Sequence, residues 1–126
     1  MDISMENLLD NLKTLIDSQN RPFKHLRKQY DSELITLIES ALKDEFKEVK
    51  INRITINKNN RLGKHKHPNQ KPISYAYIFG NFTGGELVSE DKTISVKNKW
   101  FIFNGTKEHY VKDFTGNRYS IIAYNR

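Results

Sequence analysis

The sequence of 126 residues contains no cysteine and no long apolar run. Without cysteine the chain forms neither a disulfide framework nor a thiolate metal site, so any metal must be held by imidazoles and carboxylates. No stretch is apolar enough for a transmembrane helix, and residues 1–16 form an acidic amphipathic segment rather than a signal peptide. These absences predict a soluble intracellular protein, cytoplasmic or nuclear, that is neither secreted nor held in a membrane. The length suits a single domain over residues 1–126.

Acidic residues are also missing from the middle of the chain. Residues 1–48 hold ten acidic and seven basic residues, residues 49–85 hold no acidic and seven basic residues, and residues 86–126 hold five acidic and seven basic residues. The excess of positive charge is concentrated between Lys58 and Lys71, and such a patch favours nucleic acid as a partner. Solvated loop lysines are the alternative interpretation, because runs of charge alone are weak signals.

The first 48 residues carry the periodicity of helices. Leucine and isoleucine recur at helical spacing over residues 4–18, and residues 20–22 break the pattern. A second helix is expected to begin at the cap residue Asp31. We expect both helices to support one face of a sheet. Residues 23–28 between them are expected to form a loop that could bind a ligand, with His25 as a surface residue rather than a metal ligand.

From residue 49 onward the pattern changes to that of short β-strands. β-Branched and aromatic residues alternate with polar ones and are separated by glycine, asparagine and aspartate. The expected strands cover residues 49–56, 73–79, 86–89, 93–96, 100–103, 109–111 and 118–124, with turns at residues 58–63, 80–85, 90–91 and 104–105. About seven short strands predict a sandwich or barrel. Residues 49–126 would form this core, and residues 1–48 its helical support.

Three histidines are spaced as ligands of one metal ion. His65 and His67 lie two residues apart, so both side chains point to the same face of an extended segment, and His109 follows on another expected strand. Arg118 and Ser120 share one face of the last expected strand, where a guanidinium and a hydroxyl can bind a carboxylate. The pattern therefore predicts a metal site beside an anion site.

These residues belong to a longer series of motifs. In order along the chain, the motifs are HKHPNQ at residues 65–70, GGEL at 84–87, FNG at 103–105, His109, and GNRYS at 116–120. The series resembles the Fe(II)/2-oxoglutarate-dependent dioxygenase superfamily, in particular the small TET/JBP-like nucleobase hydroxylases. The resemblance implies an α+β fold, namely a double-stranded β-helix, which is a jelly-roll or cupin-like barrel, backed by two N-terminal helices.

The resemblance also implies an enzyme and its cofactors. Fe(II) would be bound by His65, His67 and His109, and the far carboxylate of 2-oxoglutarate by Arg118 and Ser120. The implied reaction is hydroxylation of a C–H bond with release of succinate and carbon dioxide. A pyrimidine methyl group in DNA is the expected substrate, and a protein side chain or a small metabolite remains an alternative.

Four residues near the histidine pair are expected to contact that substrate. In the family, a side-chain amide five residues after the first histidine contacts the target base; here that position is Gln70, with Asn69 beside it. Lys64 and Lys66 would meet phosphates. A flipped-out base also needs aromatic neighbours, for which the aromatic residues at positions 75, 77 and 79 are candidates, although such alternation is more often found in a core.

One position departs from the family pattern, because His67 stands where the family has a metal-binding aspartate. Three neutral imidazoles lack a hard anionic ligand, so selectivity for iron over zinc, copper and nickel should weaken, and metal affinity should fall as pH drops. The alternative function is therefore a catalytically degenerate β-barrel that binds nucleic acid or an acidic ligand through its basic face. A three-histidine dioxygenase that needs no 2-oxoglutarate is a further alternative.

Two narrower alternatives concern single residues. Only two of the histidines could ligate, with His67 facing solvent, and Arg118 could form a structural ion pair with Asp113 or Glu86. The sequence leaves both open, together with the oligomeric state.

Overall fold

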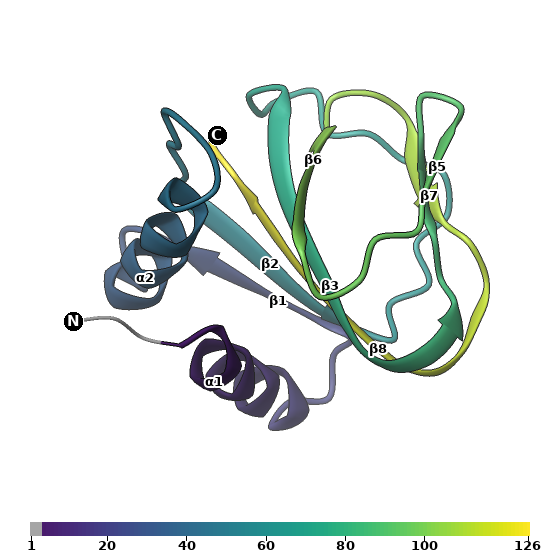
Figure 1. Cartoon of the computed structure of the whole chain (residues 1–126), viewed down its shortest axis with the longest axis horizontal. Coiled ribbons are helices and arrows are strands. Elements are labelled where there is room, and N and C mark those ends of the chain that lie inside the picture. Colours follow the sequence, from purple (N-terminus) through teal and green to yellow (C-terminus); the bar gives the residue numbers. More distant parts are fainter. Residues whose placement is uncertain (1–3) are drawn as a thin grey trace.

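A computed structural model describes residues 4–126, which form two helices and two antiparallel sheets (Figure 1). Residues 1–3, which were counted with the helical support, lie outside the described residues. The larger sheet has the strand order β1-β2-β8-β3-β6 and the smaller sheet the order β5-β4-β7. The elements are α1 (Met5–Asp17), β1 (Phe23–Arg27), α2 (Ser32–Lys43), β2 (Arg53–Lys58), β3 (Ile73–Gly84), β4 (Leu87–Ser89), β5 (Lys92–Ile94), β6 (Trp100–Asn104), β7 (His109–Val111) and β8 (Phe114–Tyr124). This arrangement confirms the predicted jelly-roll barrel.

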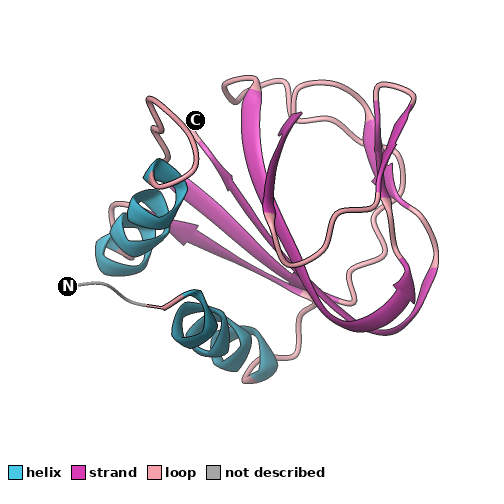
Figure 2. Cartoon of the chain, viewed as in Figure 1, coloured by secondary structure: helices cyan, strands magenta, loops and turns pink. Residues whose placement is uncertain are grey.

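Both helices pack on the same face of the larger sheet (Figure 2). Ser4 caps α1 by accepting a hydrogen bond from the backbone N–H of Asn7. The residues that the helices bury recur every three or four positions, and they are Leu8, Leu12 and Ile16 of α1 and Ile35, Ile38 and Leu42 of α2. The helices thus back the sheet, as the fold prediction required. Neither described helix is long and apolar enough to cross a membrane.

The prediction of a binding loop at residues 23–28 is wrong, because residues 23–27 form strand β1. All five residues of β1 pair with β2 in antiparallel register. Leu26 is buried beneath the helices, whereas Phe23 and His25 line a cavity on the opposite face of the sheet. The strand was missed because Leu26 is its only fully buried apolar residue, so the alternation was too short to recognise.

The turn predicted at residues 80–85 is also wrong. Strand β3 continues to Gly84 and pairs with β8 up to Phe114. Gly80 has a φ of 115°, and a Cβ placed there would lie only 2.3 Å from the backbone oxygen of Asn117. The glycines therefore bend a continuous strand pair instead of ending it, so β3 and β8 curve around the barrel (Figure 1). The first predicted strand, in turn, begins at Arg53 rather than at residue 49.

The smaller sheet covers only part of the larger one. Its inward residues Leu87, Ile94 and Val111 pack against residues of β3, β6 and β8. Among the described residues, none from β1 or β2 belongs to these clusters. The cavity face of β1 and β2 lies outside these apolar clusters; Asn57 on β2 is buried there, whereas His25 on the edge strand β1 is exposed.

Candidate metal and anion site

Backbone hydrogen bonds bring the three predicted metal ligands together. His65 and His67 lie in the connection between β2 and β3, and His109 begins β7. The N–H of His65 donates to the carbonyl of His109 at 3.0 Å, and the N–H of His109 donates to the carbonyl of His65 at 2.9 Å. The N–H of His67 donates to the carbonyl of Gly105 at 3.0 Å. The connection is thus fixed along the edge of the smaller sheet, which is why residues so distant in sequence meet.

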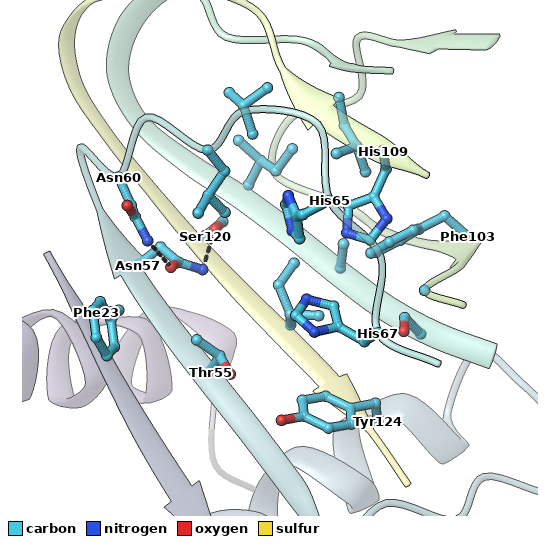
Figure 3. A pocket seen from close by; sticks show the side chains of 18 of the residues that line it. Phe23, Thr55, Asn57, Asn60, His65, His67, Phe103, His109, Ser120 and Tyr124 are labelled. Atoms are coloured by element: carbon cyan, nitrogen blue, oxygen red, sulfur yellow. Dashed lines mark hydrogen bonds between the residues drawn. The ribbon is translucent and has the colours of Figure 1, made fainter. Parts of the chain in front are cut away.

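The three imidazoles converge in the cavity between the sheets (Figure 3). The ring centroid of His65 lies 4.3 Å from that of His109 and 5.0 Å from that of His67, and the centroids of His67 and His109 are 5.8 Å apart. One nitrogen from each ring lies within 4.8 Å of the others. Two nitrogens bound to one ion by bonds of about 2.1 Å lie at most about 4.2 Å apart, so the rings would have to move slightly closer together to hold a divalent ion. The donor set therefore fits a metal.

Hydrogen bonds to backbone carbonyls fix the tautomer of two of the histidines and leave Nε2 of each for a metal. Nδ1 of His65 donates to the carbonyl of Gly63 at 2.7 Å, and Nδ1 of His109 donates to the carbonyl of Lys107 at 2.7 Å. Because a carbonyl oxygen only accepts, Nδ1 carries the proton and Nε2 keeps its lone pair for the metal. His67 is exposed and, within residues 4–126, its ring makes no such hydrogen bond. It is the least constrained of the three.

The surroundings favour the neutral imidazole, which is the form that binds metal. Desolvation lowers the pKa of His109 more than its hydrogen bond to the carbonyl of Lys107 raises it. Desolvation and the neighbouring His65 lower the pKa of His67. Both imidazoles are therefore mainly neutral at pH 7, which is the form that can bind a metal ion.

Arg118 brings a buried cation to the same cavity. Its side chain is 4% exposed, and its Nε donates to the carbonyl of Gly85 at 2.9 Å. A Cβ at Gly85 would lie 2.7 Å from Cδ of Arg118, so this glycine makes room for the arginine. Burial lowers the pKa of Arg118 to about 10, against the opposing effect of Glu86, and the guanidinium stays protonated at pH 7.

The ion pair considered for Arg118 does not form in the described part of the chain. Neither Asp113 nor Glu86 pairs with it, and Asp113 pairs with Arg61 instead. The buried guanidinium therefore has no carboxylate partner among residues 4–126 and is free to pair with an anion.

One cavity of about 490 Å³ joins the imidazoles and the guanidinium. This volume falls in the range of small-molecule sites, about 300–1,000 Å³. The apolar part of its lining includes Leu62, Ile78, Leu87 and Val111. A ligand with a metal-binding end, an apolar middle and an anionic end matches this distribution of side chains.

A buried amide beside Ser120 was missed in the sequence analysis. Asn57 is 4% exposed; its Nδ2 donates to the hydroxyl oxygen of Ser120 at 3.1 Å, and its Oδ1 accepts from Nδ2 of Asn60 at 2.9 Å. Because the Ser120 oxygen accepts from Asn57, its own proton is available for an anion. The signal lay in β2, where Thr55 and Asn57 alternate with isoleucines and so must face the other side of the sheet.

Of the four predicted substrate residues, only one lines the cavity. Gln70 lines the cavity, although its Nε2 already donates to the hydroxyl of Ser74 at 2.8 Å. Asn69, Lys64 and Lys66 are exposed and do not line the cavity. The three aromatic residues proposed as a pocket wall, Tyr75, Tyr77 and Phe79, belong to the core beneath the helices.

His25 is a further cavity residue that sequence reasoning did not assign. It is exposed, as expected of a surface residue, but it lines the same cavity as His65, His67 and His109. All four histidines of the chain thus border one space. No local sequence signal could have shown this, because it depends on β1 joining the edge of the larger sheet.

No protein-family model and no curated protein sequence matches the chain, but solved structures do. NgTET1 in complex with 5mC DNA superposes with a TM-score of 0.64 and 14% identity, covering 98% of this chain and 68% of that chain. A 2OG-Fe(II) oxygenase family oxidoreductase from Burkholderia pseudomallei has a TM-score of 0.58 and 17% identity, covering 74% and 55%. A cupin-2 domain protein from Shewanella frigidimarina has a TM-score of 0.52 and 12% identity, covering 98% and 100%.

These likenesses establish the fold. The chain has the double-stranded β-helix that these oxygenase and cupin structures share, and it spans 68% and 55% of the two oxygenase chains. At this level of identity the likeness concerns the fold alone, and the function of the protein depends on the residues of its own cavity.

Proposed function

We propose that the chain is a 2-oxoglutarate-dependent dioxygenase whose Fe(II) is held by His65, His67 and His109. The supporting observation is a single cavity that contains three converging imidazoles and a buried guanidinium to which no carboxylate of the described residues is paired. 2-Oxoglutarate chelates a metal at one end and carries a carboxylate at the other, so it can satisfy both groups at once. The bound metal and dioxygen would supply the oxidising power for attack on a C–H bond.

The chain's own groups would bind the far carboxylate of 2-oxoglutarate and keep water away. The guanidinium of Arg118 would donate charge-assisted hydrogen bonds to it, and the hydroxyl of Ser120 would donate another while Asn57 holds its oxygen in place. The apolar side chains of the cavity would pack against the bound co-substrate and reduce its contact with water.

The histidine at position 67 changes the electrostatics of the proposed site in a definite direction. Three neutral imidazoles leave the full charge of a divalent ion uncompensated, so the dianionic 2-oxoglutarate is attracted more strongly than in a site with a carboxylate ligand. Nitrogen-rich sites also suit zinc, copper and nickel. The proposed enzyme should therefore bind its co-substrate well and select poorly among metals.

We propose a nucleobase as substrate, with a pyrimidine methyl group in DNA as the first candidate. The NgTET1 structure holds 5mC DNA. In the present chain, residues 49–85 carry seven basic and no acidic residues, and this segment contains two of the proposed metal ligands. A polyanion would thus be drawn to the side of the barrel on which the cavity lies.

The test is an anaerobic titration of metal-free protein with Fe(II) and then 2-oxoglutarate, following the visible charge-transfer band of the chelate. Arg118→Met should weaken 2-oxoglutarate binding about 10- to 100-fold, because one charge-assisted interaction of about 1.5–3 kcal/mol is lost. Fe(II) binding should stay unchanged. The exposed Arg21 provides the matched control, and Arg21→Met should behave as wild type. Metal-free Arg118→Met should be about as stable as wild type, since it removes a buried charge that has no carboxylate partner among residues 4–126.

The second candidate is a non-catalytic barrel that binds an acidic ligand. The replacement of a carboxylate ligand by His67 and the likeness to a cupin favour it. Wild-type protein that forms no chelate with Fe(II) and 2-oxoglutarate would rule out the oxygenase and leave this candidate. Chelate formation followed by succinate release on adding DNA would rule out the barrel.

A further inference from the structure

The cavity has a second end, which the proposed metal and anion sites leave unused. Strands β1 and β2 contribute Phe23, His25 and Thr55 to its wall. No described residue of either strand belongs to the clusters beneath the smaller sheet, and His25 is exposed. A substrate must reach the metal from a part of the cavity that is open to solvent, and the exposed His25 marks such a part at the edge strand β1.

Strand register places this end away from the anion site. Phe23 lies opposite Asn57, which lies opposite Ser120, so the row of the anion site ends on β1 at the apolar Phe23. His25 lies in the next row, opposite Thr55, which in turn lies opposite Ile122. Because β8 places Ser120 between Arg118 and Ile122 on the cavity face, the row that ends at His25 is the more distant one from the guanidinium. A ligand at His25 and a dicarboxylate at Arg118 can therefore occupy the cavity together.

His25 is held in an orientation suited to hydrogen bonding. Its Nδ1 lies 3.0 Å from the hydroxyl oxygen of Thr55, and its ring lies 5.1 Å from that of Phe23, with an angle of 50° between the ring planes. Thr55 and Phe23 together restrict the imidazole. With Nδ1 engaged, Nε2 is the ring nitrogen that remains for a ligand. Partial desolvation and the charge of Arg27 lower the pKa of His25, so the ring is neutral at pH 7.

We propose that the cavity end formed by β1 and β2 is the substrate subsite, and that His25 hydrogen-bonds the substrate there with Phe23 as its apolar neighbour. This inference rests on the proposed function. An imidazole and a phenyl ring side by side suit a planar heterocycle with hydrogen-bonding groups on its edge, which is the chemistry of a pyrimidine base. His25 is then a specificity residue, and Thr55 is a positioning residue that acts through it.

The experiment measures chelate formation and base binding separately. The probe is a fluorescent single-stranded DNA oligonucleotide with one 5-methylcytosine, added anaerobically to protein loaded with Fe(II) and 2-oxoglutarate. His25→Phe keeps an aromatic ring and removes its hydrogen bonds, and it should lower oligonucleotide affinity about tenfold, which is the loss of one hydrogen bond. Thr55→Val should lower it less, in the same direction. The chelate band should be unchanged in both variants.

A matched control and a second readout distinguish the subsite from a general effect on the fold. Thr115 is an exposed threonine of β8 that does not line the cavity, so Thr115→Val should leave both measurements unchanged. When oxygen is admitted, His25→Phe should form more succinate per oxidised base than wild type. The reason is that 2-oxoglutarate is then more often consumed without oxidation of a base. A merely structural role for His25 would not move this ratio. If His25→Phe fails to fold, Thr55→Val alone carries the test.

The outcomes separate this proposal from the proposed function. Unchanged oligonucleotide affinity in His25→Phe overturns the subsite, and so does loss of the chelate band in that variant. Wild-type protein that forms the chelate but does not bind the oligonucleotide also overturns the subsite, while the oxygenase stands. Oligonucleotide binding that depends on His25 in protein that forms no chelate supports the subsite and overturns the oxygenase.

Discussion

Along β8, Tyr119, Ile121 and Ala123 join the core beneath the helices, whereas Arg118 and Ser120 face the cavity. The same strand therefore serves two faces, because successive side chains of a strand point in opposite directions. On the helix face, apolar groups pack against apolar groups, and the indole N–H of Trp100 is the buried polar group there that has no partner among the described residues. On the cavity face, a guanidinium and several imidazoles keep binding capacity that the fold does not use. The comparison shows that stabilising residues and ligand-binding residues are interleaved one by one.

The largest effect is expected from a large-to-small substitution in the core between the helices and the larger sheet. Leu12 is fully buried in the core between α1 and the sheet. Leu12→Ala should lower the free energy of unfolding by about 2–5 kcal/mol, through lost apolar contact and the cavity left behind. Urea denaturation measures this loss. Leu9 on the same helix is only partly buried, so Leu9→Ala is the milder control.

The same variant tests whether the two faces are independent. Under conditions in which Leu12→Ala remains folded, its affinity for Fe(II) should equal that of wild type, because Leu12 does not line the cavity. A large loss of metal affinity in the folded variant would show that the helix face sets the geometry of the histidines.

On the cavity face, the three histidines should contribute unequally to metal binding. His109 is buried, with its Nδ1 fixed by the carbonyl of Lys107, whereas His67 is exposed and its ring lacks such a partner in residues 4–126. His109→Ala should lower metal affinity by about a hundredfold or more, and His67→Ala by clearly less. Calorimetric titration with a divalent metal compares them. The exposed Lys66 serves as control through Lys66→Ala, and equal losses in both histidine variants would contradict the order.

The smallest effect is expected at the rim of the helix face, where the contacts are polar. The carboxylate of Asp17 accepts from Lys58 at 2.7 Å and from the hydroxyl of Tyr119 at 2.9 Å. The hydrogen bond from Lys58, with help from Tyr119, lowers the pKa of Asp17 below its ordinary 3.8. The folded state therefore favours the ionised carboxyl. The resulting stability is present above pH 3.8 and is lost as pH falls through the lowered value.

Acid denaturation of wild type and Asp17→Asn measures this contribution. The difference in stability between them should be small, because the pair is open to solvent, and it should shrink as the solution is acidified below pH 3.8. A difference that grows on acidification would contradict the assigned direction of the pKa shift.

The sequence was informative where a local rule applies. Helical periodicity predicted both helices, and the positive φ of Glu90 and Asp91 confirms the turn expected between β4 and β5. It misled where local signals were short or ambiguous. The glycines in residues 80–85 predicted a turn, but β3 continues through Gly84 because β8 supplies its hydrogen-bonding partners. Residues 23–27, which have one buried leucine, were predicted as a loop, but they form a strand because they pair with β2.

The candidate site shows the same division. Spacing alone placed His65 and His67 on one face and predicted Arg118 and Ser120 as neighbours, and the structure brings all four to one cavity with His109. Asn57 and His25 were missed, because each acquires its role from a residue far away in the chain. Asn57 meets Ser120 across two strands, and His25 meets Thr55 across another pair.

The amino-acid sequence thus supplies the chemical groups, namely three imidazoles, a guanidinium and a hydroxyl, and the alternation that puts His65 with His67 and Arg118 with Ser120. Which segments border the cavity depends on contacts between distant strands. Strand register is the cause. Shifting a strand by one residue exchanges its two faces, so whether His25 meets the cavity or the helices depends on how β1 pairs with β2. That pairing is settled by the burial of Leu26 beneath the helices, a contact between segments that no local pattern describes.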